Sequence, residues 1–272
     1  MKIGIFDSGF GGLSVFKAIH DLLPEYEYLY LGDSARAPYG NHSHDVIYDY
    51  VVEAVEYLFK QDCQLVILAC NTASAQALRR IQTDWLPNSD YADRRVLGVI
   101  RPIAEAVSKI AHSKKIGVIG TRATIESGVY TKEIEKQLES NADVLEQACP
   151  LLVPLIEEGF SNRPEMTKIL RYYLRPLKDK HVNILINGCT HYQLLHNAIQ
   201  KIMGKRVLVL DTANIVAESL KNYLQRHPEH ETKLSKNKSV IFYTTDESKR
   251  FNGLAGKFFG QPVKAEKVYL KR

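Results

Sequence analysis

The sequence predicts an α/β fold of two pseudosymmetric domains, each a mainly parallel sheet flanked by helices, with an active site in the cleft between them. Short apolar segments alternate with amphipathic stretches along the chain of 272 residues, as expected for parallel sheets. Residues 115–121 (KIGVIGT) repeat residues 2–8 (KIGIFDS) 113 positions later, and the segment before Cys189 repeats the one before Cys70, 119 positions later. Two motifs with similar offsets indicate an internal duplication.

The first half of the chain contains four apolar segments separated by helical patterns. The expected strands are residues 2–6, 26–31, 65–70 and 95–100, and the expected helices are residues 13–23, 44–60, 72–85 and 102–112. Asn71 and Thr72 are good N-cap types, and Pro102 occupies a permitted first-turn position. This half therefore has the strand and helix alternation of an open parallel sheet.

The second half begins with the repeated strands at residues 115–121 and 182–190. After them we expect a strand at 207–210, a helix at 213–226, a charged linker at 227–238, a strand at 239–244, a helix at 248–259 and a strand at 263–269. The second unit needs few of these last elements. We therefore assign residues 1–97 and 208–272 to the first domain and residues 98–207 to the second.

Composition narrows the class of protein. Hydrophobic residues make up 45% of the chain and charged residues 25%, which are ordinary values for a globular protein. The net charge of +5 comes from scattered residues, and with no nucleic-acid motif we expect no nucleic-acid partner. Four cysteines without a CxxC pair suit a reducing compartment. The start has no signal-peptide pattern and no run approaches a membrane span, so we expect a cytoplasmic protein without a membrane partner.

Cys70 lies where an apolar strand turns into an amphipathic helix. The carboxyl edge of a parallel sheet is where ligands bind, and a helix N-terminus favours a thiolate. A single cysteine in a strand is most often a small core residue, which is how we interpret Cys63 and Cys149. Cys70 differs because Cys189 repeats its position in the second half, so the two thiols would face each other across a pseudo-twofold cleft.

Two opposed thiols have few chemical uses. A disulfide oxidoreductase normally carries both on one motif, which is missing here. Zinc held by Cys70, Cys189 and His191 is an alternative, although the Cys-x-His spacing is unusual for zinc. A racemase that works without a cofactor needs two proton-transfer groups on opposite faces of one carbon, and the paired thiols favour this chemistry.

The segment from Asp7 to Gly12 imitates a dinucleotide-binding loop, with Asp33 at the end of the next strand. It departs from that motif because Asp7 would place a negative charge beside a pyrophosphate and Ser14 occupies the third glycine position. We therefore expect no nucleotide cofactor. Asp7 is instead a candidate at the same sheet edge as Cys70, or a solvated loop acid.

Read together, six ordered motifs resemble glutamate racemase, a cofactor-independent enzyme of the Asp/Glu racemase superfamily. They are FDSGFGGLSV (6–15), GDSARAPYG (32–40), ACNTASA (69–75), IGTRATIESGVY (119–130), CPLLVPLIEEG (149–159) and GCTHY (188–192). Aspartate racemases usually have Cys-Thr-Glu at the second cysteine, so Cys189-Thr190-His191 favours glutamate.

The resemblance implies an enzyme that interconverts L-glutamate and D-glutamate for peptidoglycan synthesis, without metal or cofactor, and a homodimer is expected. Cys70 would act on D-glutamate with help from Asp7, and Cys189 on L-glutamate with help from His191 and Glu157. The residues that match substrate-holding positions are Ser8, Pro38, Tyr39, Gly40, Asn71, Thr72, Thr121, Thr124 and Thr190. Thr121 and Thr124 also suit a helix cap.

Three departures from the family pattern are Arg101, where many members have Glu, Asn187, where Leu is common before Gly-Cys, and Asp211-Thr212, which replaces Asp-Ser. Arg101 affects a segment that connects the domains. Three rival functions remain open at this point: a related racemase such as aspartate racemase, a one-cysteine enzyme such as a decarboxylase, and a binding or regulatory protein on the same scaffold.

Overall fold

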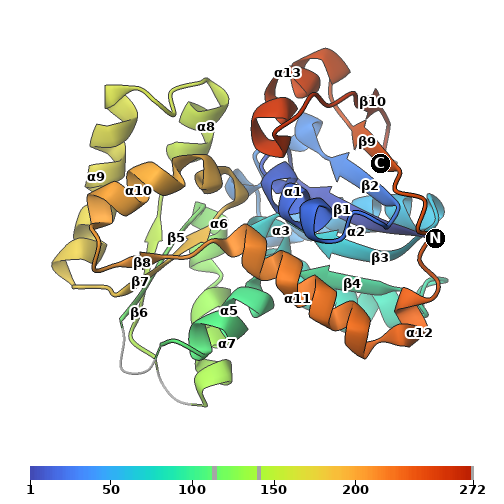
Figure 1. Ribbon diagram of the computed structural model, residues 1–272, viewed down its shortest axis with the longest axis horizontal. Coiled ribbons are helices and arrows are strands. Elements are labelled where there is room, and N and C mark those ends of the chain that lie inside the picture. The colour runs from blue at the N-terminus through green and yellow to red at the C-terminus, as the bar shows by residue number, and fades with distance from the viewer. Residues whose placement is uncertain (112–114, 140–141, 271–272) are drawn as a thin grey trace.

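Figure 1 shows the computed structural model, which describes residues 1–111, 115–139 and 142–270. The strands are β1 (Lys2–Asp7), β2 (Tyr28–Gly32), β3 (Cys63–Leu68), β4 (Arg95–Gly98), β5 (Ile116–Gly120), β6 (Val144–Ala148), β7 (Ile184–Gly188), β8 (Leu208–Val209), β9 (Val240–Thr244) and β10 (Glu266–Lys267). The longer helices are α1 (Gly12–Leu22), α2 (His44–Lys60), α5 (Ile100–Ser108), α7 (Val129–Leu138), α9 (Pro164–Asp179), α10 (His196–Met203), α11 (Thr212–Arg226) and α13 (Ser248–Phe259). The short helical segments are η1 (Ser34–Arg36), η2 (Tyr39–Asn41), α3 (Asn71–Gln76), α4 (Leu78–Arg80), η3 (Ile81–Trp85), η4 (Leu86–Asn88), α6 (Arg122–Glu126), α8 (Leu152–Glu157), η5 (Thr190–Leu195) and α12 (Pro228–Glu231).

The described strands form two parallel sheets, which confirms the predicted fold class. The larger sheet has the order β10-β9-β2-β1-β3-β4, and the smaller has the order β6-β5-β7-β8. All neighbouring strands in both sheets run parallel. Each sheet therefore gathers the carboxyl ends of its strands at one edge, where functional side chains can meet.

The two sheets share one topology around their central strands. The order β2-β1-β3-β4 corresponds to β6-β5-β7-β8. The repeated KIG motifs fall on β1 and β5, and the segments before the two cysteines fall on β3 and β7. This correspondence supports the internal duplication that the sequence indicated.

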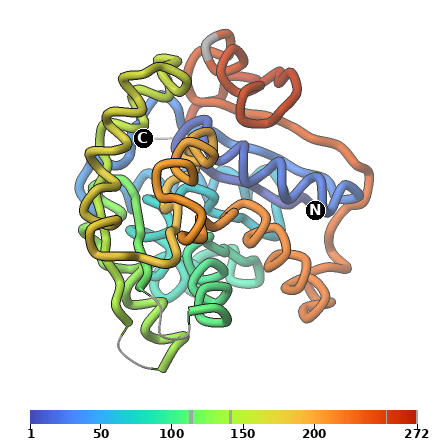
Figure 2. The backbone as a smooth tube through the Cα atoms, turned by 60° about the vertical axis from the view of Figure 1, so that its left-hand side comes forward, coloured from blue at the N-terminus to red at the C-terminus, as the bar shows by residue number. Residues whose placement is uncertain are grey.

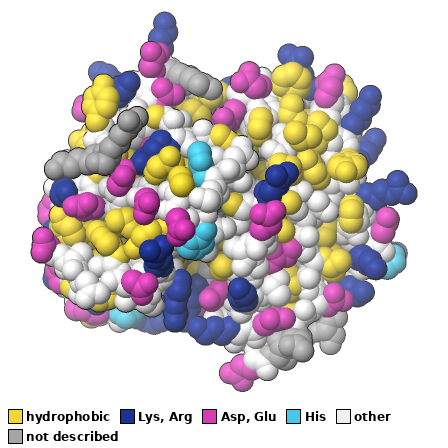
Figure 3. Space-filling view, turned by 180° about the vertical axis from the view of Figure 1, so that it is seen from behind, with side chains coloured by type: hydrophobic (Ala, Val, Ile, Leu, Met, Phe, Trp, Pro, Cys, Tyr) yellow, Lys and Arg dark blue, Asp and Glu magenta, His cyan; other side chains and the backbone are white. Residues whose placement is uncertain are grey.

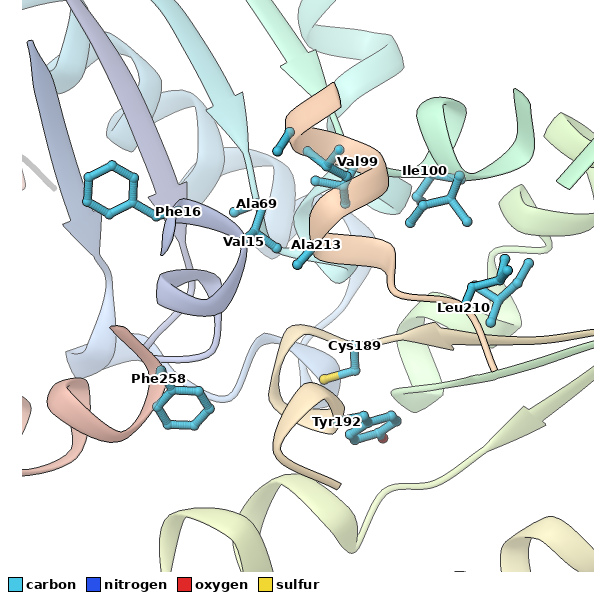
Figure 4. Close-up of a cluster of buried hydrophobic side chains, with 14 of the residues drawn as sticks. Val15, Phe16, Ala69, Val99, Ile100, Cys189, Tyr192, Leu210, Ala213 and Phe258 are labelled. Atoms are coloured by element: carbon cyan, nitrogen blue, oxygen red, sulfur yellow. The ribbon is translucent and has the colours of Figure 1, made fainter. Parts of the chain in front are cut away.

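Apolar packing covers both faces of the larger sheet. Ile3 and Ile5 pack in a core that includes residues of α1, α11 and α13, whereas Phe6 and Leu68 pack against α2. The first core continues into the smaller sheet, where Ile186 belongs to the same cluster. Figure 4 shows part of this continuous core beside the end of β7. The two units are thus joined by buried apolar contacts as well as by the chain.

Helix α11 connects the two units. It follows β8 of the smaller sheet and runs along the larger unit, where it packs against α1, and it also packs against α5 (Figures 1 and 2). Arg, Lys, Asp and Glu side chains are interspersed on the face shown in Figure 3, in agreement with the scattered charges of the sequence. Within the described residues, no helix has both the length and the apolar character needed to cross a membrane.

Several expected boundaries were wrong. The helix expected at 72–85 is divided into α3, α4 and the π-helical η3, with a break at Ala77, whose φ of −118° departs from the usual helical value, and a change to π-helix at Ile81. The strand expected at 95–100 ends at Gly98, and α5 starts at Ile100, two residues before the expected Pro102. The expected end of that helix at His112 lies outside the described residues.

The chain after residue 207 also differs from the elements and the domain division that the sequence predicts. Leu208 pairs with Ile184 and Val209 with Leu185, so β8 belongs to the smaller sheet, although we had assigned residues from 208 onward to the first domain. Gly98 pairs in the larger sheet with Leu68. The linker at 227–238 contains α12, and the last strand is limited to β10. The remaining division into domains stays a prediction.

Candidate active site

A small cavity of about 30 Å³ lies at the carboxyl ends of β3 and β7, between the two sheets. Its lining residues are Ser8, Gly9, Ala37, Pro38, Tyr39, Gly40, Cys70, Asn71, Thr72, Thr121, Val153, Glu157, Cys189, Thr190 and His191. The two cysteines are only 5% and 6% exposed. Because the cavity has room for only about two water molecules, an amino acid would fit beside the thiols only after the surrounding residues move apart.

Cys70 occupies the N-cap of α3. Its Sγ accepts a hydrogen bond from the Ala73 N–H at 3.4 Å and lies 3.4 Å from the Ser8 Oγ. Burial raises the pKa of the Cys70 thiol from 9.0 to about 11, and the Asp7 carboxylate adds to the rise, whereas the Ser8 and Ala73 hydrogen bonds oppose it. A helix N-terminus stabilises a nearby negative charge by about 0.3–1 kcal/mol, less than one pKa unit. The helix N-terminus does favour the thiolate through the Ala73 N–H, but burial outweighs this contribution.

Cys189 is the N-cap of η5, directly after β7, and Figure 4 shows its sulfur pointing toward the larger unit. Burial raises the pKa of this thiol well above its usual value. The backbone N–H of His191 opposes the rise, whereas negative charge on Cys70 or Asp7 adds to it. Because ionisation of one cysteine disfavours ionisation of the other, at most one of the two thiols is expected to ionise at a time.

Three charged or polar side chains surround the thiols. Asp7, at the end of β1, accepts a hydrogen bond from the Gly9 N–H at 3.0 Å. Burial raises the pKa of Asp7 above its usual range, and the His191 charge opposes the rise. His191 Nε2 lies 2.9 Å from Glu157 Oε1 of α8. The acid, the histidine and the second acid are therefore close enough to influence one another.

Hydroxyl groups from both units meet on another side of the cavity. The Thr72 Oγ1 lies 2.9 Å from the Thr121 Oγ1 and 3.1 Å from the Thr124 Oγ1. Thr121 also caps α6 by accepting a hydrogen bond from the Thr124 N–H at 3.2 Å. These contacts join α3 of the larger unit to α6 of the smaller one. They provide hydroxyl donors that suit a carboxylate.

The loop with Pro38, Tyr39 and Gly40 closes the cavity from the larger unit. The Tyr39 hydroxyl donates to the buried Asp33 carboxylate, which also accepts from Arg36 Nε at 2.7 Å. These bonds hold the loop against the second unit so closely that a Cβ on Gly40 would lie 2.9 Å from the Thr121 Cβ.

The structure gathers most of the predicted site residues, with two exceptions. Asp7 and Thr124 are buried behind the cavity and do not line it. Sequence reasoning missed Gly9, Ala37 and Val153, which do line it. Gly9 and Ala37 adjoin residues already singled out, and Val153 precedes Glu157 by four positions on α8, which places both on one helix face. Helical spacing was thus an available signal.

The structure also bears on the zinc alternative, and it contains a second, larger cavity. Among the described residues, no group of three or more His, Cys, Asp or Glu side chains is arranged to hold a metal ion, so the alternative zinc site has no geometric support. A larger cavity of about 650 Å³ is lined by residues of α5, α7 and α11, Arg101 among them. Neither Cys70 nor Cys189 lines it.

The family model for Asp/Glu/Hydantoin racemase matches residues 3–220. The chain belongs to this family. The glutamate racemase of Aquifex pyrophilus is 44% identical over 225 residues, which are 83% of this chain and 84% of that protein. The glutamate racemase of Sulfurihydrogenibium is 41% identical over 271 residues, covering 99% and 98% of the two chains.

Solved structures of the family agree with this assignment. A glutamate racemase from Bacillus anthracis superposes with a TM-score of 0.89 at 34% identity, covering 99% of this chain and 97% of that one. The glutamate racemase from Francisella tularensis, in complex with D-glutamate, gives a TM-score of 0.88 at 32% identity, with coverage of 99% and 97%. The resemblance on which the sequence analysis relied is confirmed.

Proposed function

We propose that this protein is a glutamate racemase that interconverts L-glutamate and D-glutamate by transferring the α-proton between Cys70 and Cys189. The observation that carries the proposal is that two thiols, from topologically equivalent strand ends, line one cavity. The similarity to glutamate racemases over almost the whole chain supports glutamate as the substrate. D-glutamate from this reaction would supply peptidoglycan synthesis.

The reaction balances without an oxidant or a cofactor. One cysteine thiolate breaks the Cα–H bond and takes the proton, and the electron pair left on Cα is delocalised into the adjacent carboxylate. The opposite thiol then donates its proton to the other face of Cα and becomes the thiolate. Cys70 would take the proton from D-glutamate, and Cys189 would take it from L-glutamate.

The other site residues would assist these two transfers. His191, held by Glu157, lines the same cavity as Cys189 and would assist proton transfer there, and the Asp7 charge acts on the ionisation of both thiols. Ser8, Asn71, Thr72, Thr121 and Thr190 supply the polar groups that would hold the substrate. Closure of the units around the substrate would exclude water and strengthen these interactions.

The test follows α-deuterium incorporation and optical rotation during incubation of each glutamate enantiomer in D2O. We expect Cys70→Ser and Cys189→Ser to lose racemisation by about 10²- to 10⁴-fold, the usual contribution of an acid–base group. Cys63→Ala is the matched control, because Cys63 is a buried thiol at the other end of β3.

Each rival function predicts a different result. Full racemisation by either serine variant would overturn the two-thiol mechanism, and a dispensable second thiol would support a one-cysteine enzyme. Binding of glutamate without deuterium exchange would support a binding or regulatory protein. Faster turnover of aspartate would support the related racemase. The homodimer and the cytoplasmic location remain predictions.

A further inference from the structure

A buried hydrogen bond joins the two units next to the thiols. The hydroxyl of Tyr130, on α7 of the smaller unit, donates to Oδ1 of Asn71 at 2.6 Å. Asn71 is the first residue of α3 and follows Cys70 directly. Tyr130 is fully buried and does not line the cavity, whereas Asn71 does.

The bond determines which end of the Asn71 amide remains for a ligand. An asparagine side chain offers one carbonyl oxygen, which accepts, and one NH2 group, which only donates. Since the Tyr130 hydroxyl occupies one of the two lone pairs of the oxygen and holds the oxygen beside Tyr130, the NH2 group is the end of the amide that we expect to bind a ligand in the cavity. A group that only donates suits a carboxylate and repels an ammonium.

We propose that Tyr130 is a positioning residue that fixes the Asn71 amide so that its Nδ2 donates to a substrate carboxylate. The inference deepens the proposed function and rests on it. Tyr130 itself would not touch the substrate. It would act through Asn71, from the opposite unit.

The surroundings of Tyr130 hold its hydroxyl in one place and in one state. Its ring packs so closely under Gly188 that a Cβ there would lie 3.1 Å from the Tyr130 Cε2. Burial raises the pKa of Tyr130, and negative charge on Cys189 adds to the rise. The hydroxyl therefore stays protonated and remains a donor throughout the pH range of the reaction.

The bond also links recognition to closure. Asn71 belongs to the larger unit and Tyr130 to the smaller one, so the amide is oriented only when the units meet. An open form would leave the amide free to rotate. Substrate recognition would then be completed in the closed form, in which the thiols are also shielded from water.

The test compares Tyr130→Phe with the matched control Tyr28→Phe. The Tyr28 hydroxyl also makes a buried hydrogen bond of 2.6 Å, to the Leu23 carbonyl, but Tyr28 does not line the cavity. We expect Tyr130→Phe to raise KM for both glutamate enantiomers about threefold to tenfold, the range for loss of one hydrogen bond. We expect kcat to change by less than about twofold. An unchanged KM, or an equal effect in both variants, would overturn the inference.

A double-mutant cycle tests whether Tyr130 acts through Asn71. Asn71→Ala removes the amide, so adding Tyr130→Phe should raise KM no further, whereas independent roles would give additive effects. Asn71→Asp distinguishes an amide whose NH2 group faces the substrate from one whose oxygen faces the substrate. It should weaken binding more than Asn71→Ala, because it presents an oxygen to the substrate carboxylate. Binding preserved in Asn71→Asp would show that the amide oxygen faces the ammonium, which contradicts the proposal.

Failure of the racemase proposal can be distinguished from failure of the positioning role of Tyr130. If the unmodified protein exchanges no α-deuterium with either glutamate enantiomer, the racemase proposal itself fails. If the unmodified protein exchanges deuterium and Tyr130→Phe has the same KM, only the positioning role fails.

Discussion

Among the single residues, the two buried thiols are the ones to which we assign the chemistry, and their ionisation depends on desolvation more than on any neighbour. Burial is the largest cause of the raised pKa of both cysteines, and the two also disfavour each other's ionisation. A pair in which one member is ionised and the other protonated is the arrangement that a two-base proton transfer needs. The sequence places the thiols, but only their surroundings determine how readily they ionise.

The raised pKa of Cys70 predicts a pH dependence for the conversion of D-glutamate. Far below a pKa of about 11, the thiolate fraction grows about tenfold per pH unit. We therefore expect log(kcat/KM) for D-glutamate to rise with a slope approaching one between about pH 6.5 and 8.5. Steady-state rates across this interval measure the slope.

An Asp7→Asn variant, measured over the same pH interval, tests whether the Asp7 charge contributes to the raised pKa of Cys70. The Asp7 charge raises the pKa of Cys70, so Asp7→Asn should move the profile to lower pH, even if its maximum rate is smaller. A flat profile in the unmodified protein, or a shift to higher pH in Asp7→Asn, would contradict this assignment.

Asn187 gives a prediction about stability. It is fully buried on β7, and neither its Oδ1 nor its Nδ2 has a hydrogen-bonding partner among the described residues. A buried amide without partners costs about 1–3 kcal/mol, so Asn187→Leu should raise the free energy of unfolding by that amount. Urea denaturation measures this change.

The contrasting variant is Asn252→Leu. The Asn252 Oδ1 accepts a hydrogen bond from the Ala265 N–H at 2.8 Å, and its loss should lower the free energy of unfolding. A decrease in Asn187→Leu of the same size would show that the Asn187 amide has a stabilising partner after all.

Among the secondary-structure elements, the junctions between strands and helices determine how closely the two units approach each other. Gly11 lies between β1 and α1, where a Cβ would stand 2.3 Å from the Thr190 Oγ1 and 2.4 Å from the His191 Nδ1. Both contacts belong to the η5 segment of the other unit. A side chain at residue 11 would therefore push η5, which follows Cys189 directly, away from the β1–α1 junction.

We accordingly expect Gly11→Ala to lower kcat/KM by at least about tenfold, because small misplacements of reacting groups are costly. Gly253→Ala is the matched control, since a Cβ on that residue of α13 meets nothing within 4 Å. Enantiomer-specific rates together with thermal melting measure the effect. Normal activity in Gly11→Ala would show that η5 can move aside at little cost.

Elements with long periodic patterns were predicted well, and those with competing signals were not. The helix α2 begins and ends where the sequence indicated, because its apolar positions repeat over 17 residues. The segment after Cys70 was expected as one helix but changes geometry at Ala77 and again at Ile81. Leu78 there packs on Gly98, where a Cβ would lie 2.5 Å from its Cδ2. Such a tertiary contact has no counterpart in local periodicity.

At the scale of the whole molecule, polar contacts between the units surround the cavity. Gln76 Nε2 donates to the Ala123 carbonyl at 2.6 Å, and Ser14 Oγ lies within 3.3 Å of the Thr190 carbonyl. The continuous apolar core lies beside them. The duplicated sheets therefore meet with their ligand-binding edges opposed, and the cavity between them is shielded from solvent.

The sequence by itself determined the alternation of strands and helices, the duplication, the family and the placement of Cys70 and Cys189 at strand ends. These features follow from local periodicity and from motifs, which act over short stretches of chain. The tertiary structure decided that both thiols share one cavity, that burial raises their pKa, that β8 joins the smaller sheet and that Tyr130 holds Asn71. These outcomes depend on desolvation and on contacts between residues far apart in the chain, which no local pattern encodes.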